Sequence, residues 1–226
     1  MKLRNFAFAL ALVSAFCAAA SVAFAQDAPK EKAPLPKFKQ DSLKLWLSPS
    51  NQIHNFGYGD YGTEKERMNQ VADIVEPIVK AQGVKVYRND PNESIKDYTR
   101  HANELGCDLY FAIHSNAFKG NARGTTAYCH RFGGEAERFT QRVHDALLEI
   151  YPGPDRKIHE SYNRYDGKPM WEPGYSNMPA CLVEIAFHDN KEDSEWILAN
   201  MQQIGEALAR AVLEHLAAEH PDCLEK

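Results

Sequence analysis

The chain has 226 residues, a mass of 25.5 kDa and a formal net charge of −5 at pH 7. This length suits one domain plus a short leader, and it is enough to bury a core without help from a metal or from disulfides. The acidic balance argues against nucleic acid as a partner and against tight adsorption to an anionic membrane, because phosphate binding needs a basic surface.

The first 25 residues have the pattern of a secretory signal peptide. A basic start precedes an alanine-rich apolar stretch that ends in Ala23-Phe24-Ala25, a small-x-small cleavage site. An uncleaved membrane anchor is the alternative, which the alanine content and the cleavage pattern disfavour. Cleavage would remove two basic residues and no acidic one, changing the formal charge from −5 to −7. We therefore expect a secreted, periplasmic protein that has no membrane contact after cleavage.

The leader is followed by a segment, residues 26–42, that is rich in proline and lysine and predicts a flexible tether. We expect the folded domain to occupy residues 43–226. Four cysteines remain after cleavage, and an oxidising compartment permits them to pair. Cys107, Cys129 and Cys181 lie in or beside strand-like apolar runs, which favours buried free thiols, and Cys223 is left open.

Strand and helix patterns alternate along the domain. Apolar runs predict strands at 43–47, 84–88, 107–114, 124–131 and 180–187. Helical periodicity predicts helices at 65–81, 93–105, 134–151, 191–199 and 202–219, and residues 152–178 form a long loop. This alternation predicts a single α/β domain with a central, mostly parallel twisted sheet that helices cover on both faces.

Glu184 is the acid that most needs an explanation. It lies in ACLVEIAF, where the other seven residues are apolar, so its carboxyl must be paired, ligated or protonated. A solvent-facing strand edge or a buried arginine partner would be the structural explanations. Buried acids also cluster at functional sites, and Glu184 is our candidate for catalysis.

A second group of polar residues indicates a metal site. His114 ends a long apolar strand, a position where a histidine is by itself more often structural. The loop after the first strand adds His54, and the next helix begins with Glu64 and Glu66. Thr63 and Glu66 form a capping-box pattern, which leaves Glu64 free for a ligand role. Catalytic zinc takes about three nitrogen or oxygen ligands and keeps one open position.

Two segments, DLYFAIHSNAF and PACLVEIAFHDNKED, resemble the zinc-dependent N-acetylmuramoyl-L-alanine amidases of the type 3 family. The resemblance spans about residues 43–219. It implies an α/β fold, a Zn²⁺ cofactor, peptidoglycan as the partner and hydrolysis of the amide between N-acetylmuramic acid and L-alanine. It further implies that Glu64 and His114 are metal ligands and that Glu184 is the catalytic acid/base. We expect a monomer.

The chain departs from this family at the first ligand. Relatives usually place a histidine after the first strand, where this chain has Asn51 followed by Gln52, and His54 comes three residues late. Chemistry favours His54 as the ligand, whereas register favours one of the two amides. Asn51, Gln52 and Asn116, the last from the histidine motif, are the expected substrate-side residues.

The departure leaves two further interpretations open. One is a peptidoglycan-binding relative with weak or no catalysis, and the other is a zinc peptidase that cuts the stem peptide. His130, His159 and aromatic residues of the long loop are candidates for substrate contact, and the same aromatic rings could instead pack on the domain. These aromatic residues are Tyr162, Tyr165, Trp171 and Tyr175.

Overall fold

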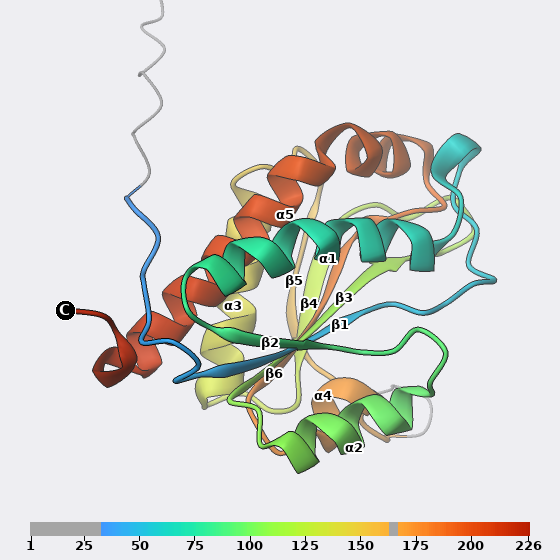
Figure 1. Ribbon diagram of the computed structural model, residues 1–226. Coiled ribbons are helices and arrows are strands. Elements are labelled where there is room, and N and C mark those ends of the chain that lie inside the picture. Colours follow the sequence, from blue (N-terminus) through green and yellow to red (C-terminus); the bar gives the residue numbers. More distant parts are fainter. Residues whose placement is uncertain (1–32, 163–166) are drawn as a thin grey trace, which may run out of the picture. The chain divides into compact units, whose positions relative to one another are not determined.

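The computed structural model describes residues 33–162 and 167–226, and the chain from Pro34 onward forms one compact unit (Figure 1). The strands are β1 (Lys44–Pro49), β2 (Lys85–Arg88), β3 (Leu109–Asn116), β4 (Thr125–Cys129), β5 (Asp155–Glu160) and β6 (Ala180–Phe187). The helices are α1 (Glu64–Ala81), α2 (Ile95–Leu105), α3 (Glu135–Leu148), α4 (Trp171–Tyr175) and α5 (Lys191–Glu219). Two 3-10 turns complete the described elements, η1 (Gly59–Tyr61) and η2 (Pro221–Cys223).

The strands form one sheet in the order β2-β1-β3-β6-β4-β5. Strands β2, β1, β3 and β6 pair in parallel, whereas β4 pairs antiparallel with β6 and parallel with β5. The prediction of a mostly parallel sheet in an α/β domain is therefore confirmed.

Helices cover both faces of this sheet, as predicted. Helices α1, α3 and α5 lie on one face, and α2 and α4 lie on the other (Figure 1). The residues of β3 alternate between the two layers: Phe111 and Ile113 belong to the larger core, whereas Tyr110 and Ala112 belong to the smaller core. This period of two directs His114 to the face of α2 and α4.

The segment 34–42 corrects the predicted tether, because it packs against the domain. Phe38 is fully buried and forms a bridge with Leu224, and its backbone N–H donates to Gln82 (2.8 Å). Gly83 at φ +91° permits this approach, since a Cβ there would lie 2.3 Å from the Phe38 carbonyl oxygen. One aromatic side chain thus orders a stretch whose proline and lysine content predicts a tether.

The predicted loop 152–178 is also corrected, because it contains β5 and α4. Strand β5 is an edge strand with mostly polar, partly exposed residues, so it lacks the apolar run by which strands are predicted. The two helices predicted near the end are one helix, α5, with a non-helical Asn200 at the predicted break. The four described cysteines form no disulfide with one another. Within the described ranges, no helix has the length and apolar character needed to cross a bilayer.

Candidate active site

Glu64 occupies the first position of α1, and its carboxyl is almost completely buried. Thr63 and Glu66 form the predicted capping box, which satisfies the start of the helix without using Glu64. Burial opposes ionisation of Glu64, but hydrogen bonds from His114 and Asn55 outweigh that cost and lower its pKa. The helix start therefore supplies a buried anion to the site.

His114 lies between two carboxylates near the end of β3. Its Nδ1 is 2.9 Å from Glu64 Oε1, and its Nε2 is 2.9 Å from Glu172 Oε2. Burial disfavours a charged ring, but the two carboxylates outweigh burial and hold the pKa of His114 well above its usual value. The structure thus brings together two of the three predicted metal ligands.

The loop after β1 places amides beside Glu64. Asn55 Nδ2 donates to Glu64 Oε2 (2.8 Å) and to Gln52 Oε1 (2.8 Å), and Gln52 Nε2 lies 3.4 Å from Glu64 Oε1. Asn51 turns to another partner, because its Nδ2 donates to the Tyr98 hydroxyl (2.7 Å). Gln52 is therefore the predicted amide that reaches the Glu64 carboxyl.

His54 is exposed, in contrast to its predicted place at the metal. Among the residues that the structure describes, no three or more His, Cys, Asp or Glu side chains converge as a metal site. The trio of His54, Glu64 and His114 is thus not assembled. The physical reason is local, since the amides of Gln52 and Asn55 occupy the space at the Glu64 carboxyl and His54 stays in solvent.

Glu184 lies beside His114 on the neighbouring strand. The two residues are register partners between β3 and β6, and a register shift follows between His114 and Asn116. The Oε2 atom of Glu184 is buried and has no hydrogen-bond partner, although the side chain as a whole is partly exposed. Burial raises the pKa of Glu184 to about 8. Such a carboxyl can take up and release a proton near neutral pH.

Glu172 belongs to this site but was missed by the sequence prediction. It sits on α4, is almost completely buried, and accepts hydrogen bonds at Oε1 from Ser48 Oγ (2.6 Å) and the Tyr110 hydroxyl (3.0 Å). The available signal was an acid among apolar and aromatic residues, MWEPGY, within the predicted loop. That signal names no partner, because the contact depends on how α4 packs against the sheet.

The motif residues beside His114 form a second buried group. Ser115 Oγ lies 2.9 Å from the Tyr61 hydroxyl and 2.9 Å from His188 Nδ1, and the rings of Tyr61 and His188 stack at 5.5 Å. Burial lowers the pKa of His188. Asn116 lies at the edge of this group, where its backbone carbonyl accepts from the N–H of His188 (2.8 Å) and its side chain accepts from the N–H of Ala117.

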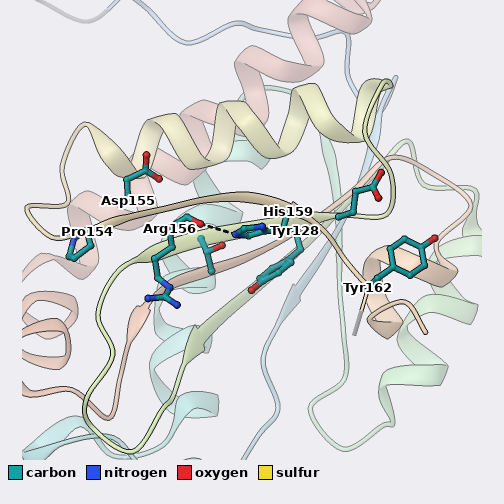
Figure 2. Close-up of a pocket in the computed structure, with 8 residues that line it drawn as sticks. Tyr128, Pro154, Asp155, Arg156, His159 and Tyr162 are labelled. Carbon is teal, nitrogen blue, oxygen red and sulfur yellow. Dashed lines mark hydrogen bonds between the residues drawn. The ribbon is translucent and has the colours of Figure 1, made fainter. Parts of the chain in front are cut away.

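A groove of about 620 Å³ lies along β4 and β5 (Figure 2). It adjoins Glu184, because its lining residue Thr126 is the register partner of Glu184 across the antiparallel pair. The lining residues are Thr126, Tyr128, Pro154, Asp155, Arg156, His159, Glu160 and Tyr162. Figure 2 shows His159 beside Tyr128, with a hydrogen bond to the Arg156 carbonyl (2.8 Å).

The other aromatic candidates of the predicted loop have different positions. Trp171 and Tyr175 stack on each other at 4.1 Å, and Trp171 Nε1 donates to Thr99 on α2. Trp171 therefore packs on the domain, which was the alternative prediction, whereas Tyr175 is exposed. Tyr165 lies outside the described residues.

Residues 51–214 match the family model described as N-acetylmuramoyl-L-alanine amidase. The chain belongs to this amidase family. The match covers most of the chain and includes Glu64, His114, Glu172 and Glu184. Comparison with curated proteins found no significant match.

Solved amidase structures share the fold of this family member. AmiC2 of Nostoc punctiforme is 19% identical, with a TM-score of 0.68, and the alignment covers 78% of this chain and 98% of that one. An amidase from Clostridium difficile 630 is 22% identical, with a TM-score of 0.69 over 80% of this chain and all of the other. The catalytic domain of CwlV from Bacillus (Paenibacillus) polymyxa is 18% identical, with a TM-score of 0.67 over 77% and 98%.

Proposed function

We propose that this amidase-family chain is a secreted, zinc-dependent enzyme that hydrolyses the bond between N-acetylmuramic acid and L-alanine in periplasmic peptidoglycan. Family membership supports the amidase activity. The observation that carries the catalytic assignment is the buried, unpartnered Oε2 of Glu184 directly beside the Glu64–His114 pair. A buried carboxyl without a partner is costly, and proton transfer during the reaction would explain why this position has one.

The donor set fits zinc at two positions and requires an amide at a third. Glu64 and His114 supply carboxylate oxygen and imidazole nitrogen, both of which are common zinc donors. Gln52 is the candidate for the third ligand because its side-chain amide lies next to the Glu64 carboxyl, with Nε2 3.4 Å from Glu64 Oε1. Its Oε1, the atom that could bind zinc, accepts from Asn55 Nδ2. A neutral amide is a weaker donor than imidazole, so we expect weaker zinc binding than in relatives with a histidine there.

Zinc bound there would polarise the scissile carbonyl and activate a water. The protein's own part is proton transfer by Glu184. Its raised pKa suits it to take a proton from the attacking water and to give one to the leaving amine of L-alanine. The groove beside Thr126 offers aromatic and polar side chains to the neighbouring part of the substrate.

The test uses purified peptidoglycan and measures new L-alanine amino ends. Glu184→Gln should reduce their release by about 10²- to 10⁴-fold, because general acid–base catalysis contributes about that much. The variant should keep its zinc, since Glu184 is not among the proposed ligands. Glu104→Gln, an exposed glutamate on α2, is the matched control and should retain full activity. Full activity of Glu184→Gln, or release from a bond within the stem peptide, would contradict the proposal.

One observation favours a second candidate, a peptidoglycan-binding relative with weak or no catalysis. His54 is exposed, and no three ionisable ligands converge within the described part of the chain. Metal analysis of the purified protein separates the candidates. Well under one zinc per chain, together with retained binding to peptidoglycan, would favour the binding protein.

A further inference from the structure

We propose that Arg156 binds a carboxylate of the stem peptide and thereby sets the side of the candidate active site on which the peptide lies. This role rests on the proposed function, because it takes peptidoglycan as the occupant of the groove along β4 and β5. Binding by Arg156 involves neither a metal nor a proton transfer, so it can be measured apart from catalysis.

A bulge in β5 places Arg156 near Glu184. The register between β4 and β5 shifts at Thr126, where two residues of β5, Arg156 and Lys157, lie opposite one residue of β4. Lys157 has φ +69°, a left-handed conformation that lysine rarely adopts, and its carbonyl accepts from Thr126 Oγ1 (2.8 Å). Bulges redirect side chains and are common next to active sites. Because Thr126 is also the register partner of Glu184, one residue of β4 separates the bulge from the candidate catalytic acid.

The bulge also determines the face of the sheet to which Arg156 points. Asp155 contacts His144 of α3 (2.7 Å), and Ile158 packs on the larger core, so both of these side chains face α3. Arg156 points to the opposite side, where it lines the groove together with Tyr128 (Figure 2). The smaller core, with α2 and α4, lies on that same side, and Tyr128 packs against it. Arg156 therefore shares a face of the sheet with the candidate active site.

Contacts along its length hold the Arg156 side chain in place. Its methylene groups lie against Gly124, where an added Cβ would come within 2.5 Å of Arg156 Cγ. Gly124 also has φ +127°, so glycine is needed there both for the backbone and for the space. The guanidinium lies over the Phe187 ring, 5.2 Å from its centre, and Nη1 donates to the Arg123 carbonyl (3.4 Å). A guanidinium held in this way loses little freedom when it binds an anion.

Arg156 is a cation without an acidic partner. Within residues 33–162 and 167–226 it forms no ion pair, and its guanidinium donates only to a backbone carbonyl. The acidic residues that line the groove are engaged elsewhere, because Asp155 pairs with Lys157 and Glu160 lies 3.6 Å from Arg131. A guanidinium can bind a carboxylate through two parallel hydrogen bonds. Arg156 thus offers the groove a positioned site for a carboxylate of the ligand.

The chemistry of peptidoglycan assigns this site to the peptide. The glycan side of the scissile bond carries no anion, because the lactyl carboxyl of N-acetylmuramic acid is consumed in the amide to L-alanine. The stem peptide does carry carboxylates, and the one nearest to the scissile bond belongs to the D-glutamate that follows L-alanine, unless it is amidated. We therefore expect this carboxylate at Arg156 and the glycan on the other side of Glu184, toward β3.

The test compares two soluble fragments, N-acetylmuramoyl-L-alanyl-D-glutamate and the same molecule amidated at the glutamate α-carboxyl. Their affinities are measured by titration calorimetry in the Glu184→Gln background, which prevents turnover. We expect this protein to prefer the acidic fragment about tenfold, the contribution of a charge-assisted hydrogen bond. Adding Arg156→Gln should remove the preference by weakening only the acidic fragment. Adding Arg138→Gln, an exposed arginine on α3 across the sheet, is the matched control and should leave the preference unchanged.

The role of Arg156 and the proposed catalysis can fail separately. Equal affinity for both fragments, binding of neither, or an unchanged preference after Arg156→Gln would overturn the role of Arg156, even if the wild type cleaves peptidoglycan. A preference that depends on Arg156 would support it, even if the wild type cleaves nothing. Should Arg156→Gln not fold, Arg156→Lys provides the test, because an ammonium keeps the charge but cannot form the two parallel hydrogen bonds. A reduced preference in Arg156→Lys supports the role, and an unchanged preference contradicts it.

Discussion

Gln52 and His54 are two residues apart in one loop, and both are exposed. Gln52 nevertheless contacts the buried Glu64 carboxyl, both directly and through Asn55. A ligand must reach the buried pair of Glu64 and His114, so position counts before chemical preference. In this loop, the histidine is the stronger zinc donor, but the glutamine lies closer to the Glu64 carboxyl.

Two substitutions test this difference. Gln52→His should raise zinc affinity, on the order of tenfold, because imidazole is a stronger zinc donor than a neutral amide. His54→Ala should leave zinc affinity unchanged, since its side chain does not reach Glu64. Isothermal titration of both variants and the wild type measures the outcome. Loss of zinc in His54→Ala would show that the loop rearranges to bring that histidine to the metal.

At this scale, the sequence predicted those site residues whose position follows from local pattern. Glu64 stands out beside a capping box, and His114 and Glu184 are polar groups on apolar strands that pair in register. Glu172 could not be found this way, because it lies on a helix of five residues that has no apolar pattern and its partners Ser48 and His114 lie on other elements. Its role depends on packing, which no local pattern encodes.

The segment before β1 acts as a structural element although it is neither helix nor strand. Phe38 is buried and belongs to the same larger core as Leu43 and Val84, and the backbone around it bonds to Gln82, Gly83 and Cys223. The segment around Phe38 thus covers the end of the sheet at which β1 and β2 begin. The core therefore starts earlier in the chain than the apolar pattern predicts.

Phe38→Ala should lower the free energy of unfolding by about 3–4 kcal/mol, because it removes a buried aromatic ring and leaves a cavity. Urea unfolding followed by circular dichroism measures the change. Phe118→Ala is the matched control, since that ring is 63% exposed and its loss should cost far less. Equal losses in the two variants would mean that the segment does not pack in solution as described.

Most strands and α-helices were predictable, and the one strand and one α-helix that were missed share a physical cause. β1, β3 and β6 carry apolar runs, and the longer helices carry apolar periodicity, so their sequence alone indicates them. Strand β5 reads DRKIHE and α4 has five residues, so neither has a periodic apolar face. Both elements depend on tertiary contacts, β5 on its pairing with β4 and α4 on its packing against α2 and β6.

On the scale of the whole molecule, the interface of α3 and α5 encloses a histidine that resists protonation. His215 is fully buried, its ring lies 4.8 Å from that of Phe139, and its Nδ1 has no hydrogen-bond partner. Burial lowers the pKa of His215 to about 4. Its unfolded value is near 6.5, so the unfolded chain binds the additional proton between these two values.

The sign of the pH dependence follows. Between pH 6.5 and 4 the unfolded state is favoured by proton uptake, so the stability from neutral His215 is present above pH 6.5 and is lost as pH falls. His215→Gln lacks this titration. From pH 7 to pH 4, the wild type should lose up to roughly 3 kcal/mol more stability than the variant, as measured by urea unfolding at each pH. Parallel losses in both proteins would contradict the assignment.

The bridge between Phe38 and Leu224 brings the first and last described segments together at one end of the domain. Lys37 and Glu225 pair at 3.0 Å next to that bridge, so the first and last described segments leave the domain together. They do so where β1 and β2 begin, whereas Glu64, His114 and Glu184 lie toward the opposite ends of the parallel strands. If either terminus were attached to a surface or to another domain, the end of the sheet that carries Glu64, His114 and Glu184 would lie away from the attachment point. That end would then stay accessible to a large polymer such as peptidoglycan.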